Sequence, residues 1–348
     1  MKAAILENKG VMSYREVPTP TPQPGNVILQ VKAASICGSD ISRYVKGHRL
    51  YPLILGHECA GVITAVGEGV SEGLIGQSAA IIPLVPCFKC EQCRAGRYSA
   101  CHTYSFIGSR QAGGFADCVE LRASNVFLIP GELAFEEAAL IEPATVARHI
   151  LDLGSFTSGD TAIVLGAGSI GLMAVQWLRI LGARLIVCTD VVDENLAAAR
   201  QLGAHLTLNP TRDDVKAEVK QLTGDGVDVA LECAGSPQAL AQTLQVTRPR
   251  GNIVCGGNQP LDASLPMSFI EDLMRKELRL NGCFMSYSAP FPGHEWTETV
   301  EAMQAGQLDM AAMISHRFPL SQAPQVFDDI GARRFAFRKI MLFPAAHD

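Results

Sequence analysis

The sequence lacks the features that direct a chain to nucleic acid or to a membrane. Its 29 Lys and Arg are outnumbered by 35 Asp and Glu, giving a formal net charge of −6, and no basic cluster stands out. Because binding to a phosphate backbone needs clustered cations, we expect no nucleic-acid partner. The longest apolar stretch, 169–188, is broken by Arg179 and Arg184, so it fits a helix plus a strand better than a membrane span.

The sequence also lacks repeats, low-complexity segments and, in its opening MKAAILENKG, the apolar core of a signal peptide. We therefore expect a cytoplasmic protein with no membrane partner. Structural disulfides are rare in that compartment, and the odd total of 11 cysteines cannot be fully paired. The cysteines are better interpreted as metal ligands or packing residues.

Two kinds of pattern divide the 348 residues. Residues 1 to about 145 contain short strand-like runs separated by Gly and Pro, which is typical of a β-rich, barrel-like domain. From about 160, short apolar strands alternate with helical segments, which indicates a parallel sheet with crossover helices. The end of the chain returns to mixed character and closes with the strand-like FRKIMLFP. The sequence thus predicts an α/β protein in which a doubly wound domain is inserted near the end of a β-rich one.

GAGSIG at 166–171 follows a predicted strand and opens a predicted helix, which is the context of a dinucleotide-binding turn. In that interpretation Gly166 permits the tight turn, Gly168 lets the backbone approach a pyrophosphate, and Gly171 lets the helix pack on the strand. The helix N-terminus then stabilises the phosphate charge. The alternative is an ordinary glycine-rich turn. The predicted cofactor contacts are Gly166, Gly168, Ser169, Ile170, Gly171 and Asp190.

Asp190 ends the next predicted strand, nineteen residues after Gly171. A carboxylate there can accept hydrogen bonds from the adenosine ribose and would repel a 2′-phosphate. Val191 and Val192 supply no arginine for such a phosphate, so we expect NAD as the cofactor. Capping of the following helix is an alternative role for Asp190, and the two roles are compatible.

Four cysteines are crowded into one short stretch with the spacing C-x2-C-x2-C-x7-C, namely Cys87, Cys90, Cys93 and Cys101. Four thiolates at this spacing can close a tetrahedral zinc site, which leaves no position for a substrate. The cluster therefore predicts a structural zinc. An iron–sulfur cluster is the competing interpretation, although nothing else in the sequence indicates electron transfer.

A second set of zinc-ligand types is scattered along the chain. Cys37 lies in SICGSD, His57 and Glu58 in GHE, and Glu142 in IEP. A catalytic zinc usually keeps three protein ligands and one open position. Each residue also has a structural alternative: a buried small thiol, a core histidine or a surface helix glutamate.

The order CGSD, GHE, four clustered cysteines, IEP, GAGSIG and a downstream Asp resembles the zinc-dependent medium-chain dehydrogenase/reductase family over essentially the whole chain. PLVPCFKCEQC, FIGSRQAGGFA, SYSAPFPGHEW and ISHRF resemble its polyol branch. The resemblance implies a GroES-like catalytic domain over 1–146 and 290–348, and a Rossmann domain over 147–289. It also implies two zinc ions per chain, one catalytic and one structural, and a homodimer or homotetramer.

The resemblance also implies roles for single residues. Cys37 and His57 would bind the catalytic zinc, with Glu58 and Glu142 as acidic positions of which one binds directly and the other through water, or which exchange. Asp40 would orient His57, and Ser39 would pass on the alcohol proton. Liver-type alcohol dehydrogenases have a cysteine in place of Glu142 and a relay histidine in place of Ser42, so the proton exit is undefined.

The implied reaction oxidises a secondary alcohol of a polyol or sugar-alcohol phosphate to a ketone, with galactitol 1-phosphate as the first candidate. An unphosphorylated polyol, a sugar acid or L-threonine is the alternative, and a non-catalytic cofactor-binding protein is an alternative of another class. A substrate phosphate would need a cation. Arg43, Lys46 and Arg110 are the candidates, and each has solvated surface charge as its alternative.

Overall fold

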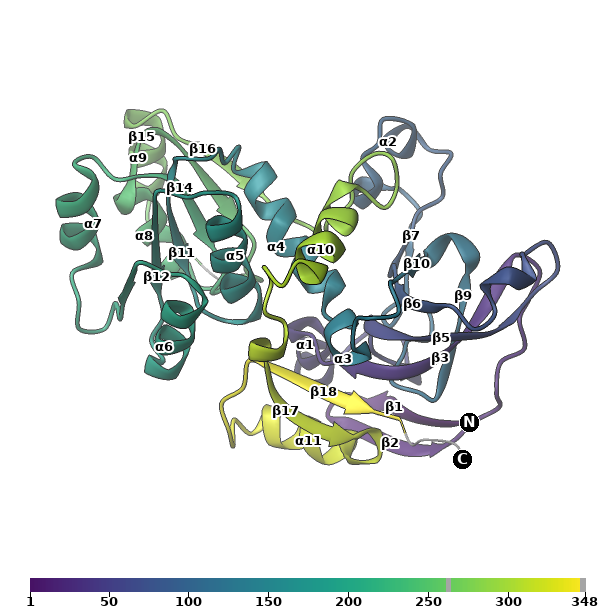
Figure 1. Ribbon diagram of the computed structural model, residues 1–348. Helices are drawn as coiled ribbons and strands as arrows, with labels where there is room; N and C mark the ends of the chain where they lie inside the picture. The colour runs from purple at the N-terminus through teal and green to yellow at the C-terminus, as the bar shows by residue number, and fades with distance from the viewer. Residues whose placement is uncertain (261–263, 345–348) are drawn as a thin grey trace. The chain divides into compact units, whose positions relative to one another are not determined.

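A computed structural model describes residues 1–260 and 264–344 (Figure 1). The chain forms two compact units. The first comprises Met1–Glu142, Ser288–Trp296 and the residues from Met310 onward, and the second comprises Pro143–Tyr287 and Thr297–Asp309. The sequence had placed the boundaries after 146 and before 290, within a few residues of these positions.

The main difference concerns residues 297–309, which the sequence assigned to the first domain. In the structure Gln176 Nε2 donates to the Asp309 carbonyl at 3.5 Å, and the Asp309 N–H donates to Gln176 Oε1 at 2.7 Å. Arg179 donates to the Gln307 carbonyl at 2.5 Å. These bonds group the segment with the second unit, and pairing of this kind leaves no periodic signal in a sequence.

The first unit is built mainly from antiparallel strands. Its strands are β1 (Lys2–Asn8), β2 (Val11–Glu16), β3 (Asn26–Ser35), β4 (Leu53–Ile54), β5 (Glu58–Val66), β6 (Ser78–Ile81), β7 (Leu84–Val85), β8 (Ser105–Phe106), β9 (Cys118–Arg122), β10 (Val126–Leu128), β17 (Ile314–Pro319) and β18 (Lys339–Phe343). Its helices are α1 (Gly38–Lys46), α2 (Glu91–Arg94), α3 (Phe135–Ala138) and α11 (Ala323–Gly331). Helices α4 (Ile141–Leu153) and α10 (His294–Gln304) each contain a unit boundary.

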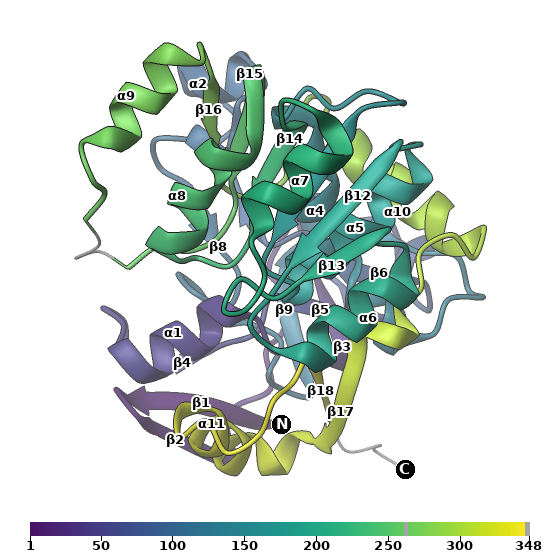
Figure 2. The ribbon, with the colours of Figure 1, turned by 90° about the vertical axis from the view of Figure 1, so that its left-hand side faces the viewer.

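Strand β3 is central to the first unit, because it pairs with β5, β9 and β18. The sheet runs β10-β6-β5-β3-β18-β17, and a smaller sheet runs β2-β1-β4. Leu29 of β3 and Ile63 of β5 are fully buried. They belong to one hydrophobic core with Phe115 and with Phe327, which lies on α11. Helix α11 packs against β2 (Figure 2). The C-terminal strand predicted from FRKIMLFP is β18, so the end of the chain completes the sheet that the N-terminal half begins.

The second unit has a parallel sheet in the order β13-β12-β11-β14-β15-β16. Its strands are β11 (Thr161–Leu165), β12 (Leu185–Thr189), β13 (Leu206–Leu208), β14 (Val227–Glu232), β15 (Thr247–Cys255) and β16 (Arg279–Gly282). Its helices are α5 (Ser169–Ile180), α6 (Asp193–Leu202), α7 (Val215–Thr223), α8 (Pro237–Val246) and α9 (Ser268–Arg275). Figure 1 shows α5 and α6 on one face of the sheet and α7, α8 and α9 on the other, as their mutual contacts require.

The chain order reverses beside β11, because β12 lies on one side of it and β14 on the other. In doubly wound sheets a dinucleotide binds at the carboxyl ends of the strands at this point. The α/β fold with an inserted Rossmann unit is therefore as predicted. Among the helices of the described residues, none is both long and apolar enough to cross a membrane.

Candidate functional site

The scattered zinc-ligand types come together in the first unit. Cys37 precedes α1 and caps it, and its Sγ accepts the Ser39 N–H at 3.5 Å. Glu58 begins β5, His57 directly precedes it, and both are buried. The ligand atoms of Cys37, His57 and Glu58 all lie within 4.8 Å of one another. Because β3 and β5 are paired, the end of β3 that leads to Cys37 lies beside the start of β5, which explains how residues twenty positions apart meet.

Glu142, the fourth predicted residue, starts α4 and is 8% exposed. It lies outside the group of three defined by the 4.8 Å limit, yet its carboxyl interacts electrostatically with His57 and Glu58. Burial raises the pKa of Glu142 to about 7. The charge of His57 lowers this pKa, and the charge of Glu58 raises it further. The structure thus places a carboxyl group that readily takes up or releases a proton beside the three-residue group.

Asp40 is fully buried, and its Oδ1 lies 3.6 Å from His57 Nδ1. Burial would raise the pKa of Asp40, but His57 and Arg43 outweigh burial and lower it. A buried carboxylate facing one ring nitrogen leaves the other nitrogen of the imidazole for a metal. This geometry agrees with the orienting role predicted for Asp40.

Sequence reasoning missed the partners of Glu58. The Lys339 ammonium contacts Glu58 Oε1 at 2.6 Å and Oε2 at 2.5 Å, and the Ser35 hydroxyl donates to Oε2. Lys339 is 2% exposed. Burial alone would lower the pKa of Lys339, but Glu58 outweighs burial and raises it. The available signal was a lysine inside the apolar strand KIMLF, where a buried charge needs a partner.

The candidate cations have different surroundings. Arg43 Nη1 donates to Ser39 Oγ at 2.8 Å and lies 3.4 Å from Asp40 Oδ1, so it belongs to the group around Ser39. Arg110 donates to the Tyr104 carbonyl at 2.6 Å and stacks on the Tyr104 ring at 3.7 Å. Lys46 is exposed in the last turn of α1.

The four clustered cysteines also converge, in a separate lobe around α2. All four Sγ atoms lie within 4.8 Å of one another, with 4.0 Å between Cys87 and Cys93 and 4.0 Å between Cys90 and Cys101. Four sulfurs at about 2.3 Å from a tetrahedral zinc are about 3.8 Å apart, so the spacing fits that ion. The backbone N–H groups of Lys89 and Cys90 lower the pKa of Cys87 to about 6, which favours the thiolate.

The predicted dinucleotide turn lies in the second unit. Gly166 has a φ of +103°, and a Cβ there would come within 2.6 Å of the Ala234 nitrogen. A Cβ on Gly171 would lie 1.8 Å from the Gly166 carbonyl oxygen, so α5 packs directly on the turn. A Cβ on Gly168 would meet nothing within 4 Å, which is the open approach that a pyrophosphate needs.

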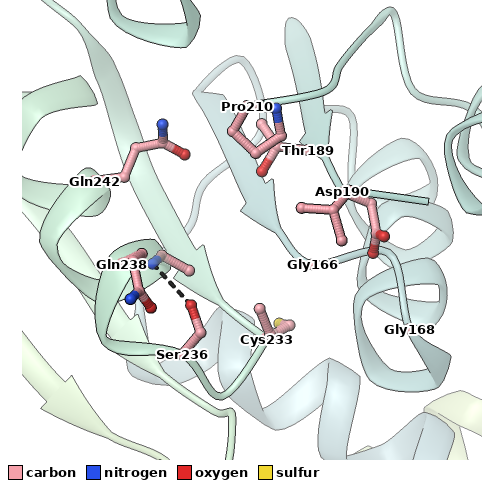
Figure 3. A pocket seen from close by; sticks show the side chains of 12 residues that line it. Gly166, Gly168, Thr189, Asp190, Pro210, Cys233, Ser236, Gln238 and Gln242 are labelled. Carbon is pink, nitrogen blue, oxygen red and sulfur yellow. Dashed lines mark hydrogen bonds between the residues drawn. The ribbon is translucent and has the colours of Figure 1, made fainter. Parts of the chain in front are cut away.

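A cavity of about 590 Å³ opens beside this turn. Figure 3 shows Asp190 and Gly168 on one side and Ser236, Gln238 and Gln242 on the other. Gly166, Gly168 and Asp190 of the predicted contacts line the cavity, whereas Ser169, Ile170 and Gly171 are not among the described residues that line it. Asp190 Oδ2 accepts the Ala167 N–H at 2.7 Å and Oδ1 accepts the Val192 N–H at 2.8 Å. These bonds hold an acidic side chain at the cavity.

Comparison with known proteins agrees with this geometry. Residues 23–131 match the alcohol dehydrogenase GroES-like domain, and residues 169–305 match the zinc-binding dehydrogenase domain. The chain is 34% identical to galactitol 1-phosphate 5-dehydrogenase of Escherichia coli K12, over 99% of this chain and 100% of that protein. It is also 34% identical to sorbitol dehydrogenase of Bacillus subtilis, over 99% and 97% of the two chains.

Solved structures give the same result. The crystal structure of Escherichia coli galactitol-1-phosphate dehydrogenase matches with a TM-score of 0.94 at 34% identity, over 99% of this chain and 100% of that chain. A zinc-binding dehydrogenase from Sinorhizobium meliloti bound to NADP matches at 0.91 and 30% identity, over 99% of each chain. An alcohol dehydrogenase from Escherichia coli CFT073 complexed with NADH matches at 0.89 and 29%, over 99% of each chain.

The fold and the site therefore define a zinc-dependent, nicotinamide-dinucleotide-using oxidoreductase. The chain belongs to the zinc-dependent medium-chain dehydrogenase family and to its polyol dehydrogenases. As an enzyme of this family it is not the non-catalytic cofactor-binding protein that the sequence had left as an alternative.

Proposed function

We propose that this protein oxidises a secondary alcohol of a sugar-alcohol phosphate to a ketone with NAD, in the cytoplasm, and that galactitol 1-phosphate is its substrate. The observation that carries the proposal is the group of half-buried Cys37 with buried His57 and Glu58, and with the Ser39 hydroxyl on the adjoining turn of α1. A thiolate, an imidazole and carboxylates form the donor set of a catalytic zinc with an open position.

Cys37 and His57 would hold the catalytic zinc together with a carboxylate. When bound, zinc lowers the pKa of a substrate hydroxyl and stabilises the negative oxygen. Glu58 lies within the ligand group but is bound through both oxygens by Lys339. Glu142 lies at its edge, where its carboxyl interacts electrostatically with His57, Glu58 and Lys339. Because Glu58 belongs to the three-residue ligand group, we propose Glu58 as the direct ligand and Glu142 as the carboxylate that acts through water.

Ser39 would pass on the alcohol proton, and Arg43 acts on Ser39. Ser39 Oγ accepts a hydrogen bond from Arg43, which fixes the direction of the hydroxyl. A guanidinium has no acceptor and does not lose its proton, so Arg43 cannot take the proton from Ser39. Arg43 therefore positions Ser39, and the proton must leave Ser39 by a route other than the guanidinium.

The phosphate preference is supported by the 34% identical galactitol 1-phosphate 5-dehydrogenase, which aligns over its whole length. Among the predicted cations, Arg43 lies nearest to the chemistry through its bond to Ser39, whereas Arg110 is held by Tyr104. Because the phosphate on C1 is several bonds from a reacting C5, we propose that it meets Lys46, which is exposed in the last turn of α1, whereas Arg43 holds Ser39.

An unphosphorylated polyol is the second candidate, because sorbitol dehydrogenase is equally identical to the chain. Initial rates with galactitol 1-phosphate, sorbitol, L-idonate and L-threonine, each with NAD and read at 340 nm, separate the candidates. We expect the highest kcat/KM for galactitol 1-phosphate. A higher value for sorbitol would replace that substrate assignment while keeping the reaction.

NAD is proposed over NADP because Asp190 is fixed at the cavity by two backbone N–H groups. Arg212, beyond the cavity residue Pro210, is engaged by Asp193 at 2.7 and 3.0 Å. A carboxylate at the cavity and a neutralised arginine both disfavour a 2′-phosphate. NADP is the alternative, as in the Sinorhizobium meliloti relative.

We further propose that a second zinc occupies the four-cysteine lobe and that the protein is a homodimer or homotetramer. The support for assembly is the sheet edge at β16, where Leu280 is 39% exposed, together with Phe284 after the strand at 59% and Met274 of α9 at 72%. An exposed edge strand with apolar side chains is a typical pairing surface. Light scattering tests the assembly, and a monomer would overturn it.

A further inference from the structure

Glu232 is a fully buried glutamate that the proposed chemistry does not use. It is the last residue of β14, at the carboxyl edge of the parallel sheet. Its neighbour Cys233 lines the 590 Å³ cavity beside the glycine-rich turn, which we call the dinucleotide cavity. A buried carboxylate is costly unless its oxygens accept hydrogen bonds, so the identity of its partners indicates what the residue does.

The two carboxylate oxygens bind two different loops. Oε1 accepts the N–H of Gly235 at 2.7 Å, of Ala234 at 2.9 Å and of Ser236 at 3.4 Å. Oε2 accepts Nε2 of Gln259 at 2.7 Å. One side chain therefore ties the loop after β14 to the loop after β15. In the ion pairs of the described residues no cation pairs with Glu232, and burial outweighs these N–H groups, so the pKa of Glu232 is raised.

The two loops are packed too closely for this arrangement to vary freely. A Cβ on Gly257 would lie 2.2 Å from the Gly235 nitrogen and 2.7 Å from Glu232 Oε2. A Cβ on Gly235 would lie 2.6 Å from the Asn258 carbonyl oxygen. The loop after β14 also touches the glycine-rich turn, where Ala234 faces Gly166. The carboxylate thus sits at a junction of three backbone segments.

The loop fixed by Glu232 forms one wall of the dinucleotide cavity (Figure 3). Cys233, Ala234 and Ser236 line that wall. Ser236 also caps α8, because its Oγ accepts the Ala239 N–H at 3.1 Å. Gln238 and Gln242 of α8 continue the wall. The position of the Glu232 carboxylate therefore sets both the loop and the start of α8.

We propose that Glu232 is a positioning residue for the cofactor: its carboxylate and the Gln259 amide form a clamp that holds the β14 loop against the glycine-rich turn. The inference rests on the proposed use of NAD by this cavity. The clamp needs two things. One oxygen at position 232 must accept the three loop N–H groups, and the side chains at positions 232 and 259 must form one donor–acceptor pair. It does not need the negative charge to be at position 232.

The test exchanges the two side chains. Glu232→Met keeps the length of the side chain but removes both acceptor oxygens, so both arms of the clamp are lost; Glu232→Gln alone is not used, because the Gln259 amide could turn and accept from the new NH2. We expect about a tenfold weaker Kd for NADH, followed by its fluorescence, and a raised KM for NAD with kcat within about threefold of the wild type. The double variant Glu232→Gln/Gln259→Glu restores the donor–acceptor pair. We expect its Kd to return to within about threefold of the wild type.

The outcomes separate the clamp from the proposed function. A wild-type protein that binds no NADH would overturn the proposed function. Wild-type binding that is unchanged in a folded Glu232→Met protein would overturn the clamp alone. Weak binding that the double variant does not restore would assign the effect to charge and would also overturn the clamp. Glu218→Met, at an exposed glutamate of α7, is the matched control.

A variant that spares Glu232 keeps the test open if Glu232→Met does not fold. Gln259→Leu removes the second arm and leaves the bonds to the β14 loop in place. We expect NADH binding to weaken by about threefold, with the melting temperature close to that of the wild type. Unchanged binding in Gln259→Leu would contradict a clamp formed by both side chains.

Discussion

The two cysteine-containing regions of the first unit present opposite kinds of metal site. In the lobe around α2, four thiols converge from one stretch of chain; backbone N–H groups lower the pKa of Cys87 and Cys90, whereas burial raises the pKa of Cys93 to about 12. Around Cys37, one thiol meets an imidazole and carboxylates from separate strands and helices, and the partners Lys339 and Asp40 are buried. The first region offers four thiols, enough to fill a tetrahedral coordination sphere, whereas the second offers three ligand groups with titratable neighbours.

The difference teaches that ligand density in a sequence does not locate chemistry. Local spacing suffices for the lobe, because a short loop can wrap around an ion. The dispersed site needs the pairing of β3 with β5 and the start of α4 to bring its ligands together. A site assembled by the fold can keep a position open for substrate, and the predictions below test that division of roles.

The largest effect is expected from Cys37→Ala. Loss of the thiolate removes a catalytic ligand, so we expect kcat/KM to fall by at least about 1000-fold, equivalent to about 4 kcal/mol. The melting temperature and NADH affinity should stay close to the wild type, because Cys37 packs at the edge of α1. Rate assays and thermal melts on one preparation check this, with Cys118→Ala as a control thiol in β9. Comparable turnover in Cys37→Ala would contradict the catalytic-zinc assignment.

Cys90→Ala is expected to affect stability instead. An open coordination position in the lobe should destabilise the fold by roughly 3 kcal/mol, at the upper end for one substitution. Protein that stays folded should keep most of its kcat. Denaturant unfolding and specific activity at low temperature are the measurements. A folded variant with no activity would show that the lobe takes part in the chemistry.

Lys339→Met tests the ion pair beside the open site. Removing one partner of a buried pair leaves an uncompensated charge and is expected to cost about 3 kcal/mol. The double variant Lys339→Met/Glu58→Gln should recover part of that loss, because neither charge is left unpaired. Urea denaturation compares both with Lys220→Met, an exposed control in α7. A Lys339→Met protein as stable as the control would contradict the buried pairing.

Asp190→Ser tests the cofactor preference of the second unit. Removing the carboxylate removes the repulsion of a 2′-phosphate, so the ratio of kcat/KM for NADP to that for NAD should rise about tenfold. The matched control is Glu194→Gln, which changes an exposed acidic residue of α6 outside the cavity lining. A wild-type enzyme that already prefers NADP would contradict the role given to Asp190.

The smallest expected effect is a change in stability at low pH, a condition often used to strip zinc from thiolates. Burial would raise the pKa of Asp228, but hydrogen bonds from Thr161 and Arg248 outweigh burial and lower it. Its stabilisation is therefore present above about pH 4 and is lost as the pH falls through the lowered pKa. Asp228→Asn should cost about 1 kcal/mol at pH 7 and nothing in strong acid. Melting curves from pH 3 to 7 test this, and a difference that grows in acid would reverse the sign.

The sequence was sufficient for features that depend on local spacing. Short, contiguous sequence patterns predicted three features: the glycine-rich turn, the parallel sheet around β11 and the four-cysteine lobe. The pairing of Lys339 with Glu58 and of Arg43 with Ser39 was not predictable, because each depends on which side chains the fold brings into contact. The same holds for Glu232, which reads as an ordinary glutamate between an apolar strand and a cysteine. Glu142 stood out only through the family resemblance.

The account is tested most directly by zinc content and activity measured together on the wild type, Cys37→Ala and Cys90→Ala. We predict about two zinc ions per chain in the wild type and about one in each variant. The Cys37→Ala protein should be inactive with an unchanged melting temperature, whereas Cys90→Ala should be active but less stable. An inactive, fully stable Cys90→Ala, or an active Cys37→Ala that keeps both ions, would show that the chemistry lies in the cysteine lobe.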